Sequence, residues 1–242
     1  SNRYDYFNNR MEVAKMSKKL VFAAGAAIGL IAVALVHFGN PANMGFCIAC
    51  FIRDTAGALG IQRAEPVQYI RPELIGMVLG ALLMAIISKE FMPRGGSAPM
   101  TRFVLGVCVM IAALVFLGCP LRMMLRIAGG DLNAVVGLLG FIGGIGMGVI
   151  FLKRGFSLKR TYKLPLADGI WLPAIQIGLL ALLIAAPAFI FFSESGPGSM
   201  HAPLLIALAA GLIAGLLAQK TRLCTVAGIR DLIMFKDWTM IM

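Results

Sequence analysis

The stretch that decides the fold lies between two apolar runs and reads Gly39-Asn-Pro-Ala-Asn-Met-Gly-Phe-Cys-Ile-Ala-Cys-Phe-Ile-Arg-Asp54. Pro41 and Gly45 break the preceding helix, and the uncharged segment that follows is too short to cross a membrane. Such backbone is tolerated at membrane depth only where it is buried in protein or lines a cavity. We therefore expect a re-entrant half-helix whose free N–H groups favour an anion, with Cys47 and Cys50 on one face.

The composition of the whole chain indicates a membrane protein. Of its 242 residues, 60% are hydrophobic and 14% are charged, whereas soluble domains have about 45–50% apolar and about 25% charged residues. These values exclude a disordered or fibrous chain. Six apolar runs are candidates to cross a bilayer as helices, so we expect an all-α polytopic membrane protein. They are residues 20–36, 74–88, 103–121, 132–152, 169–193 and 202–218.

The positive charges predict the orientation of these six spans. Lys and Arg gather in residues 1–19, in residues 153–168 and after residue 218, whereas residues 194–201 contain none. Basic segments of membrane proteins stay in the cytoplasm, and an N-terminus on that side places every heavily basic segment there and the segment without Lys or Arg outside. We therefore expect a multi-pass protein of the bacterial inner (plasma) membrane with a cytoplasmic N-terminus. The net charge of +11 then reflects topology, and we expect no nucleic-acid partner.

Two segments of the chain resemble each other. Cys47–Asp54 and Cys224–Asp231 share Cys, Ile, Arg and Asp at equivalent positions, and the predicted topology places the two copies in opposite orientations. Inverted repeats with broken helices at matching positions are typical of transporters and channels. The predicted units are a cytoplasmic segment (1–19), a first repeat (20–152) with its re-entrant segment (39–54), a basic cytoplasmic loop (153–168), a linking helix (169–193) and the start of a second inverted repeat (194–242).

Small residues recur at helical spacing in four of the spans. Closely approaching helices in membranes use Gly-x-x-x-Gly faces of this kind. We therefore expect these faces to mediate helix packing, above all the triple in the fourth span. The motifs are Gly25/Gly29, Gly76/Gly80, Gly140/Gly144/Gly148 and Gly211/Gly215.

The repeated cysteines and arginines suggest the chemistry. A thiol is a weak donor whose polarizable sulfur suits the soft sulfur or selenium of a small anion. Arg53 and Arg230 are costly inside a membrane, which indicates an anion or a carboxylate partner. Asp54 and Asp231 follow them directly, so a local salt bridge at the membrane surface explains each arginine equally well.

Two further cysteines lie in the third span. Cys119 stands between Gly118 and Pro120, where the backbone opens at the outer end of the helix, and we expect it to face the pathway. Cys108 lies mid-helix among Val and Met, and we expect it to be a small packed core residue.

Four motifs give the chain a specific resemblance. They are Gly39–Asp54, Phe116-Leu-Gly-Cys-Pro-Leu-Arg122, Ala128-Gly-Gly-Asp-Leu-Asn133 and Gln219-Lys-Thr-Arg-Leu-Cys224. The sequence resembles the YeeE/YedE family of sulfur-compound permeases, and within it the branch associated with selenium metabolism. The resemblance implies an inner-membrane helical fold of two inverted halves and thiosulfate-type uptake along a narrow path lined by cysteines.

The resemblance also implies roles for individual residues and for the length. Cys47, Cys119 and Cys224 match the family's motif cysteines, and Cys50 belongs to the Cys-x-x-Cys variant of the selenium branch. A full second half would give a chain of roughly 329 residues. We therefore expect the second repeat to be truncated at its C-terminal end in this chain.

The sequence thus predicts a permease, not an enzyme, for a small sulfur- or selenium-containing anion, without cofactor or resident metal. Its expected partners are that anion, the lipid bilayer and a cytoplasmic sulfur- or selenium-handling protein. A membrane thiol–disulfide oxidoreductase and a soft-metal carrier are the alternatives. The predicted pathway residues are Cys47, Cys50, Cys119, Cys224, Arg53 and Arg230, and the predicted supporting residues are Pro41, Gly45, Asp54, Gly118, Pro120 and Asp231.

Overall fold

The structure, a computed structural model, describes residues 18–116, 118–157 and 160–236. Most of the predicted N-terminal cytoplasmic segment, including Arg3 and Arg10, lies outside the described residues. The secondary-structure elements are α2 (Lys18–His37), α3 (Ile48–Ala58), a 3₁₀ turn η1 (Glu65–Val67), α4 (Pro72–Ile87), β1 (Arg94–Gly96), α5 (Pro99–Val115), α6 (Pro120–Ala128), α7 (Leu132–Lys153), β2 (Thr161–Lys163), α8 (Leu166–Ala185), α9 (Leu204–Thr221) and α10 (Thr225–Phe235).

The prediction of an all-α polytopic membrane protein is confirmed. Six helical segments of the described chain are long and apolar enough to cross a membrane, as the sequence predicts. Three of them are interrupted: Glu65–Ile87 between η1 and α4, Pro99–Ala128 between α5 and α6, and Leu204–Phe235 between α9 and α10. The only strands among the described residues are β1 and β2, which form a short antiparallel pair.

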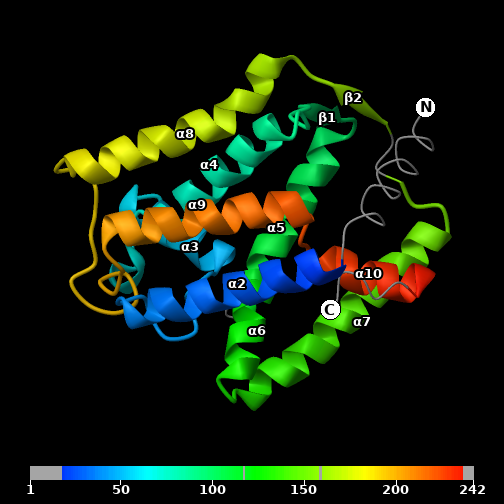
Figure 1. The fold of residues 1–242 in the computed structure, drawn as a ribbon, viewed down its shortest axis with the longest axis horizontal. Helices are drawn as coiled ribbons and strands as arrows, with labels where there is room; N and C mark the ends of the chain where they lie inside the picture. Colours follow the sequence, from blue (N-terminus) through cyan, green and yellow to red (C-terminus); the bar gives the residue numbers. More distant parts are fainter. Residues whose placement is uncertain (1–17, 117, 158–159, 237–242) are drawn as a thin grey trace.

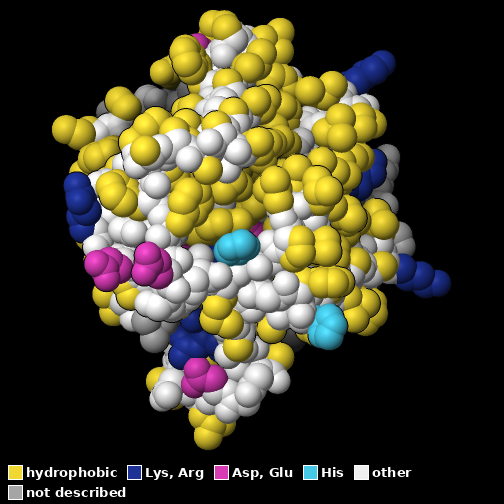
Figure 2. Space-filling view, turned by 90° about the vertical axis from the view of Figure 1, so that its left-hand side faces the viewer, with side chains coloured by type: hydrophobic (Ala, Val, Ile, Leu, Met, Phe, Trp, Pro, Cys, Tyr) yellow, Lys and Arg dark blue, Asp and Glu magenta, His cyan; other side chains and the backbone are white. Residues whose placement is uncertain are grey.

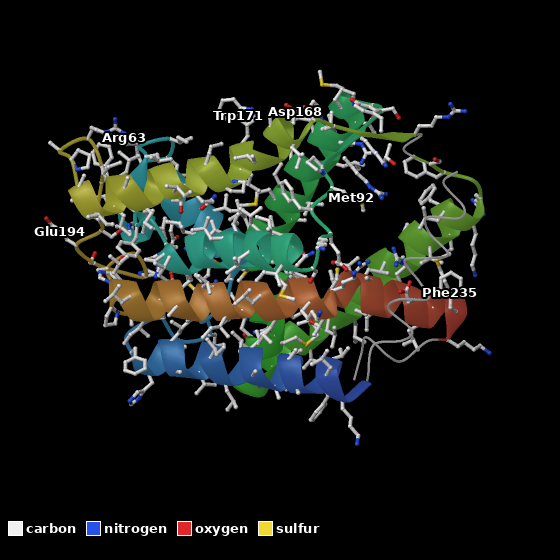
Figure 3. The ribbon with its side chains drawn as sticks, turned by 45° about the horizontal axis from the view of Figure 1, so that its top comes forward. Arg63, Met92, Asp168, Trp171, Glu194 and Phe235 are labelled. Carbon is white, nitrogen blue, oxygen red and sulfur yellow. The ribbon has the colours of Figure 1, made fainter. Side chains whose placement is uncertain are left out.

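Four long helices lie side by side and carry the core. Figure 1 shows α2, α9, α4 and α8 in this order from bottom to top, with α5 and α6 crossing behind them. We call the end at which α2 begins the Lys18 end and the opposite end the His37 end. Figure 3 marks the His37 end by Arg63 and Glu194 and the Lys18 end by Phe235. Figure 2 views the His37 end, where charged side chains form only small separate groups.

The segment between α2 and η1 turns back within the bundle. The chain leaves α2 at the His37 end, descends along α2 and begins α3 at Ile48, which lines an internal cavity. Gly45 passes so close to α2 that a methyl group there would strike the carbonyl of Ala32. Helix α3 then returns to the His37 end, where the Ala58 carbonyl accepts the N–H of Phe191. The glycine in the predicted break therefore permits a close backbone approach.

The two copies of the repeated segment are alike in part. α2 and α9 lie against each other and run in opposite directions (Figure 1), and each is followed by a break and a short helix that begins after a cysteine. The short helices differ in their neighbours: α3 contacts α4 and α5, whereas α10 contacts α7. Inversion is therefore visible in the long helices and in the placement of the cysteines, but the packing of the short helices is different.

Two of the four glycine motifs form the tightest helix contact. Gly76 and Gly80 on α4 face Gly211 and Gly215 on α9, and a methyl group on any of them would collide with a backbone carbonyl of the opposite helix. Removing side chains from both faces lets the backbones touch, as helix pairs in membranes often do. The α4–α9 pair therefore forms the rigid centre of the fold.

The prediction for the other two motifs is wrong within the described chain. Gly25 and Gly29 on α2, and Gly140, Gly144 and Gly148 on α7, have open space where a side chain would stand. α7, α5 and α8 are mostly exposed and strongly apolar. Trp171 on α8, labelled in Figure 3, points away from the bundle. In a membrane protein such surfaces face the hydrocarbon of the lipids, and helix–helix packing does not require small residues there.

This difference predicts opposite effects of the same substitution. Gly215→Ala places a methyl group against the Met77 carbonyl and should lower the free energy of unfolding by about 1–3 kcal/mol. Gly144→Ala meets open space and should leave that free energy unchanged or raise it by up to about 1 kcal/mol. Denaturant titration of both variants in the same detergent measures the difference, and equal losses would contradict the assigned roles of the two motifs.

Candidate functional site

Three of the five cysteines form one buried cluster. Cys47, Cys50 and Cys119 are 0%, 3% and 8% exposed and pack with Met44 and Met110. Cys47 packs with both Cys50 and Cys119 in this cluster. All three are free thiols, so the structure brings together a patch of soft sulfur that separate segments of the chain contribute.

The cluster exists because helices begin there. Cys47 is the N-cap of α3, and its sulfur accepts the Cys50 N–H at 3.4 Å. Cys119 is the N-cap of α6, with Pro120 in the first helical position, where a missing N–H costs nothing. Gly118 precedes it with φ of +145°, a backbone conformation that favours glycine. The predicted supporting residues Gly118 and Pro120 therefore stand where the chain turns.

Cys224 repeats this local arrangement at the start of a third short helix. It is the N-cap of α10, in extended conformation, and unlike the other three motif cysteines it is exposed. In the break between α9 and α10, Arg222, two residues before Cys224, adopts a left-handed conformation with φ of +51°. Three of the four cysteines predicted to line a pathway thus occupy the same structural position, directly before a helix.

A cavity of about 220 Å³ lies between these three helix starts. Cys119 and Cys224 both line it, together with Ile48, Pro120 and Thr225, which are the first residues of α3, α6 and α10. Each helix start carries N–H groups without helical partners and the positive end of the helix dipole. The remaining lining is mostly apolar. This combination suits a small anion with a soft atom better than a strongly hydrated cation.

Arg122 provides the positive charge of the cluster, and the predicted pathway does not include it. Its Nη1 donates to the Cys50 sulfur at 3.2 Å, and its Nε is buried without a hydrogen-bond partner among the described residues. The sequence does indicate that Arg122 lies near Cys119, because Arg122 ends the motif that contains Cys119 and follows that cysteine by one helical turn. Sequence reasoning had no means of linking it to Cys50, which is 72 residues away.

Arg53 has a different neighbourhood from the predicted one. Its guanidinium donates to Asp54 at 2.7 and 3.0 Å, so the salt bridge predicted as the alternative is present. Asp54 is fully buried and also binds Arg71, whose side chain is fully buried as well. The Arg71 guanidinium also donates hydrogen bonds to the backbone carbonyls of Pro197 and Met200. The pair is therefore part of an internal network that fixes α3 to the loop before α9, and the sequence analysis missed Arg71.

Arg230 and Asp231 form the matching pair of the second copy, and this pair is open. The two side chains lie 2.9 Å apart and are 35% and 24% exposed. Arg230 borders an apolar surface pocket with residues of α5 and α7, away from the buried thiols. Arg230 therefore lies away from the thiol cluster. Arg53 is near enough for its charge to act on Cys50, but its guanidinium binds Asp54. The arginine that donates to the Cys50 sulfur is Arg122.

Polar contacts also hold segments together at the His37 end. Asn40 donates to Glu73 at 2.7 Å and accepts the Ala202 N–H at 2.9 Å, while Tyr69 stacks on His201 with ring centroids 4.3 Å apart. Glu73 is fully buried, and its second carboxyl oxygen has no partner among the residues the structure covers. These contacts tie the segment containing Pro41, itself buried, to α4 and to the start of α9.

The turn between α6 and α7 carries a separate ion pair. Arg126 binds Asp131 at 2.6 Å, and the hydrogen bond from this guanidinium holds the pKa of the Asp131 carboxyl below its usual range. Asp131 also caps α7 by accepting the N–H of Asn133. This pair therefore positions α6, which carries Arg122, against α7.

Two further observations concern the remaining predictions. Cys108 is exposed on α5, so the expectation that it packs in the core is wrong: its face of α5 is turned outward. No group of three or more His, Cys, Asp or Glu side chains within residues 18–116, 118–157 and 160–236 is arranged to hold a metal ion.

Comparison of the chain with family models, curated proteins and solved structures finds no match.

The two Arg–Asp pairs predict different costs for the same substitution. Asp54→Ala leaves the buried Arg71 charge without its carboxylate and should lower the free energy of unfolding by about 3–5 kcal/mol. Asp231→Ala removes the carboxylate of the more exposed Arg230–Asp231 pair and should lower the free energy of unfolding by less than about 1 kcal/mol. Denaturant titration in detergent compares the two variants. A loss below about 1 kcal/mol for Asp54→Ala would show that the network does not hold α3 in place.

Proposed function

We propose that the protein is an inner-membrane permease for a small sulfur- or selenium-containing anion, such as thiosulfate. The observation that carries the proposal is the meeting of thiols and helix starts around one cavity. Cys47 and Cys119 begin α3 and α6 in the buried cluster, and Cys119 shares its cavity with Cys224 at the start of α10. The resemblance to sulfur-compound permeases agrees with this chemistry.

The cluster offers different partners to the two ends of such an anion. Thiosulfate has oxygen atoms that carry much of the negative charge and a terminal sulfur that is large and polarizable. Arg122 and the free N–H groups of the helix starts compensate the charge, which would otherwise be costly inside a membrane protein. The thiols are weak donors that meet the soft terminal atom without the strong desolvation penalty of hydroxyl groups. Sulfate lacks that soft atom and should bind less well.

The cavities suggest a route from the cluster toward the Lys18 end. The cavity between Cys119 and Cys224 shares the lining residues Met77, Ala218 and Leu223 with a larger hollow at that end. The distribution of Lys and Arg favours the cytoplasm for the Lys18 end. An anion would then enter from the His37 end, pass the thiols of the cluster and leave past Cys224, where a sulfur- or selenium-handling protein would receive it.

The two alternative functions have weaker support. A thiol–disulfide oxidoreductase needs an attacking sulfur that a protein or quinone substrate can reach. Cys47, Cys50 and Cys119 are all at least nine-tenths buried, and the cavity that Cys119 lines, about 220 Å³, suits a small anion better than such a large substrate. A soft-metal carrier would use thiolates in a shared coordination sphere. The contact between Arg122 and Cys50 places a cation beside the thiols, which repels a metal ion and attracts an anion.

Binding and uptake of radiolabelled thiosulfate test the proposal. Cys119→Ala removes a thiol, and Arg122→Gln removes the positive charge beside Cys50, so each should weaken binding roughly tenfold to a hundredfold. Cys119→Ser keeps a donor but replaces sulfur with a harder oxygen, and it should recover part of the affinity. Cys108→Ala changes an outward-facing thiol on the helix that leads to Cys119 and should bind like the parent.

The measurements use detergent-solubilised protein for binding and reconstituted vesicles for uptake, at matched protein amounts. Excess unlabelled thiosulfate should compete with the label, and excess sulfate should compete poorly. If Cys119→Ala binds as well as the parent, Cys119 is a packing residue and the proposed path loses its central thiol. Equal competition by sulfate would show that the thiols do not select a soft atom.

A further inference from the structure

A hollow with a volume of about 1000 Å³ lies at the Lys18 end, between the ends of α4 and α9. Its deep wall is apolar and consists of Met77, Val78 and Ala81 from α4 and Gly215, Ala218 and Leu223 from α9 and the break after it. Its rim is polar and basic, with Lys89 and Arg94 beyond α4 and Arg222 beyond α9. The hollow therefore changes from apolar to cationic along its length.

The dimensions of the wall correspond to one leaflet of a bilayer. The residues that line the hollow on the α4 side are Met77, Val78 and Ala81, followed by Ser88 just after the helix. The hollow as a whole therefore reaches roughly 16 Å along the α4 axis, from the apolar wall at Met77 to the polar rim at Ser88. The hydrocarbon core of a membrane is about 30 Å thick, so this distance is about half of it. The basic rim then lies at the depth of the lipid headgroups, because α4 ends at Ile87 and the charged residues follow.

The charges of the rim do not cancel. Arg222 binds Glu90 at 3.3 Å, and this pair contributes no net charge. Lys89 and Arg94 are both exposed, and among the hollow's lining residues no further carboxylate faces them. The hollow therefore carries two net positive charges above an apolar wall, which complements a ligand with an anionic head and a hydrocarbon tail.

We propose that this hollow binds an anionic phospholipid, with its phosphate at Lys89 and Arg94 and an acyl chain along the wall formed by α4 and α9. Basic pockets between membrane helices on the cytoplasmic side bind anionic headgroups in this way. A zwitterionic lipid offers the same chain without the net charge, and a free oxyanion offers the charge without the chain. The hollow adjoins the proposed exit past Cys224, so a lipid bound there would border the path of the anion, but lipid binding does not depend on which anion is transported.

Lipid retention by the purified protein tests this site. The protein is equilibrated in a non-ionic detergent with equal amounts of phosphatidylglycerol and phosphatidylcholine, and bound lipid is counted by native mass spectrometry. Phosphatidylglycerol should be retained preferentially by the parent. Each basic residue near an anionic headgroup strengthens binding about fivefold, so the double variant Lys89→Ala/Arg94→Ala should weaken phosphatidylglycerol binding roughly twentyfold.

A control variant distinguishes lipid binding in the hollow from a general attraction between basic residues and anionic lipids. Lys153→Ala/Arg154→Ala removes two exposed basic residues at the same end of the molecule but outside the hollow, and it should change retention less than about twofold. Three results would overturn the proposal: equal retention of the two lipids by the parent, equal losses in the two double variants, or displacement of bound phosphatidylglycerol by excess inorganic phosphate. The last result would identify a site for free anions.

Discussion

The fold depends on how helix starts are satisfied inside an apolar molecule. Every helix begins with N–H groups that have no helical partner, and in a membrane interior water is not available to bind them. The chain places such starts at Ile48, Pro120 and Thr225 and precedes each one with a cysteine. Thiols satisfy these groups only weakly, as the 3.4 Å contact between Cys47 and the Cys50 N–H shows. The helix starts therefore keep the capacity to bind an anion.

This arrangement requires a rigid frame, which two other interactions provide. The backbone contact between α4 and α9 depends on four glycines and fixes the helices that border the cavity. The buried contact between Asp54 and Arg71 anchors the far end of α3 to the loop before α9. A short helix held at its far end keeps its first residue, and hence Cys47, in one place. Buried ion pairs confer such positional specificity even where their net contribution to stability is small.

Much of the fold could be predicted from the sequence because its signals are local. Apolar runs locate the six spans, and the Pro41 and Gly45 break indicates the re-entrant segment. The site could be predicted only in part, since contacts between distant segments have no local signal. Cys47, Cys50 and Cys119 were identified one by one, whereas Arg71 resembles any arginine before a span and Arg122 resembles a loop residue. The glycine motifs show the same limit: Gly215 and Gly144 have similar sequence contexts but opposite surroundings.

The most direct measurement is thiol cross-linking across the proposed cluster. A short bifunctional thiol reagent, small enough to enter the cavity that Cys119 lines, should join Cys47 to Cys119 in a variant that keeps only these two cysteines, because the two residues pack in one buried cluster. The matched variant keeps Cys47 and the outward-facing Cys108, and it should give no intramolecular product. A high yield for Cys47 with Cys119 alone is the result we predict. Equal yields in both variants, or no cross-link between Cys47 and Cys119, would contradict the convergence of helix starts on which the account rests.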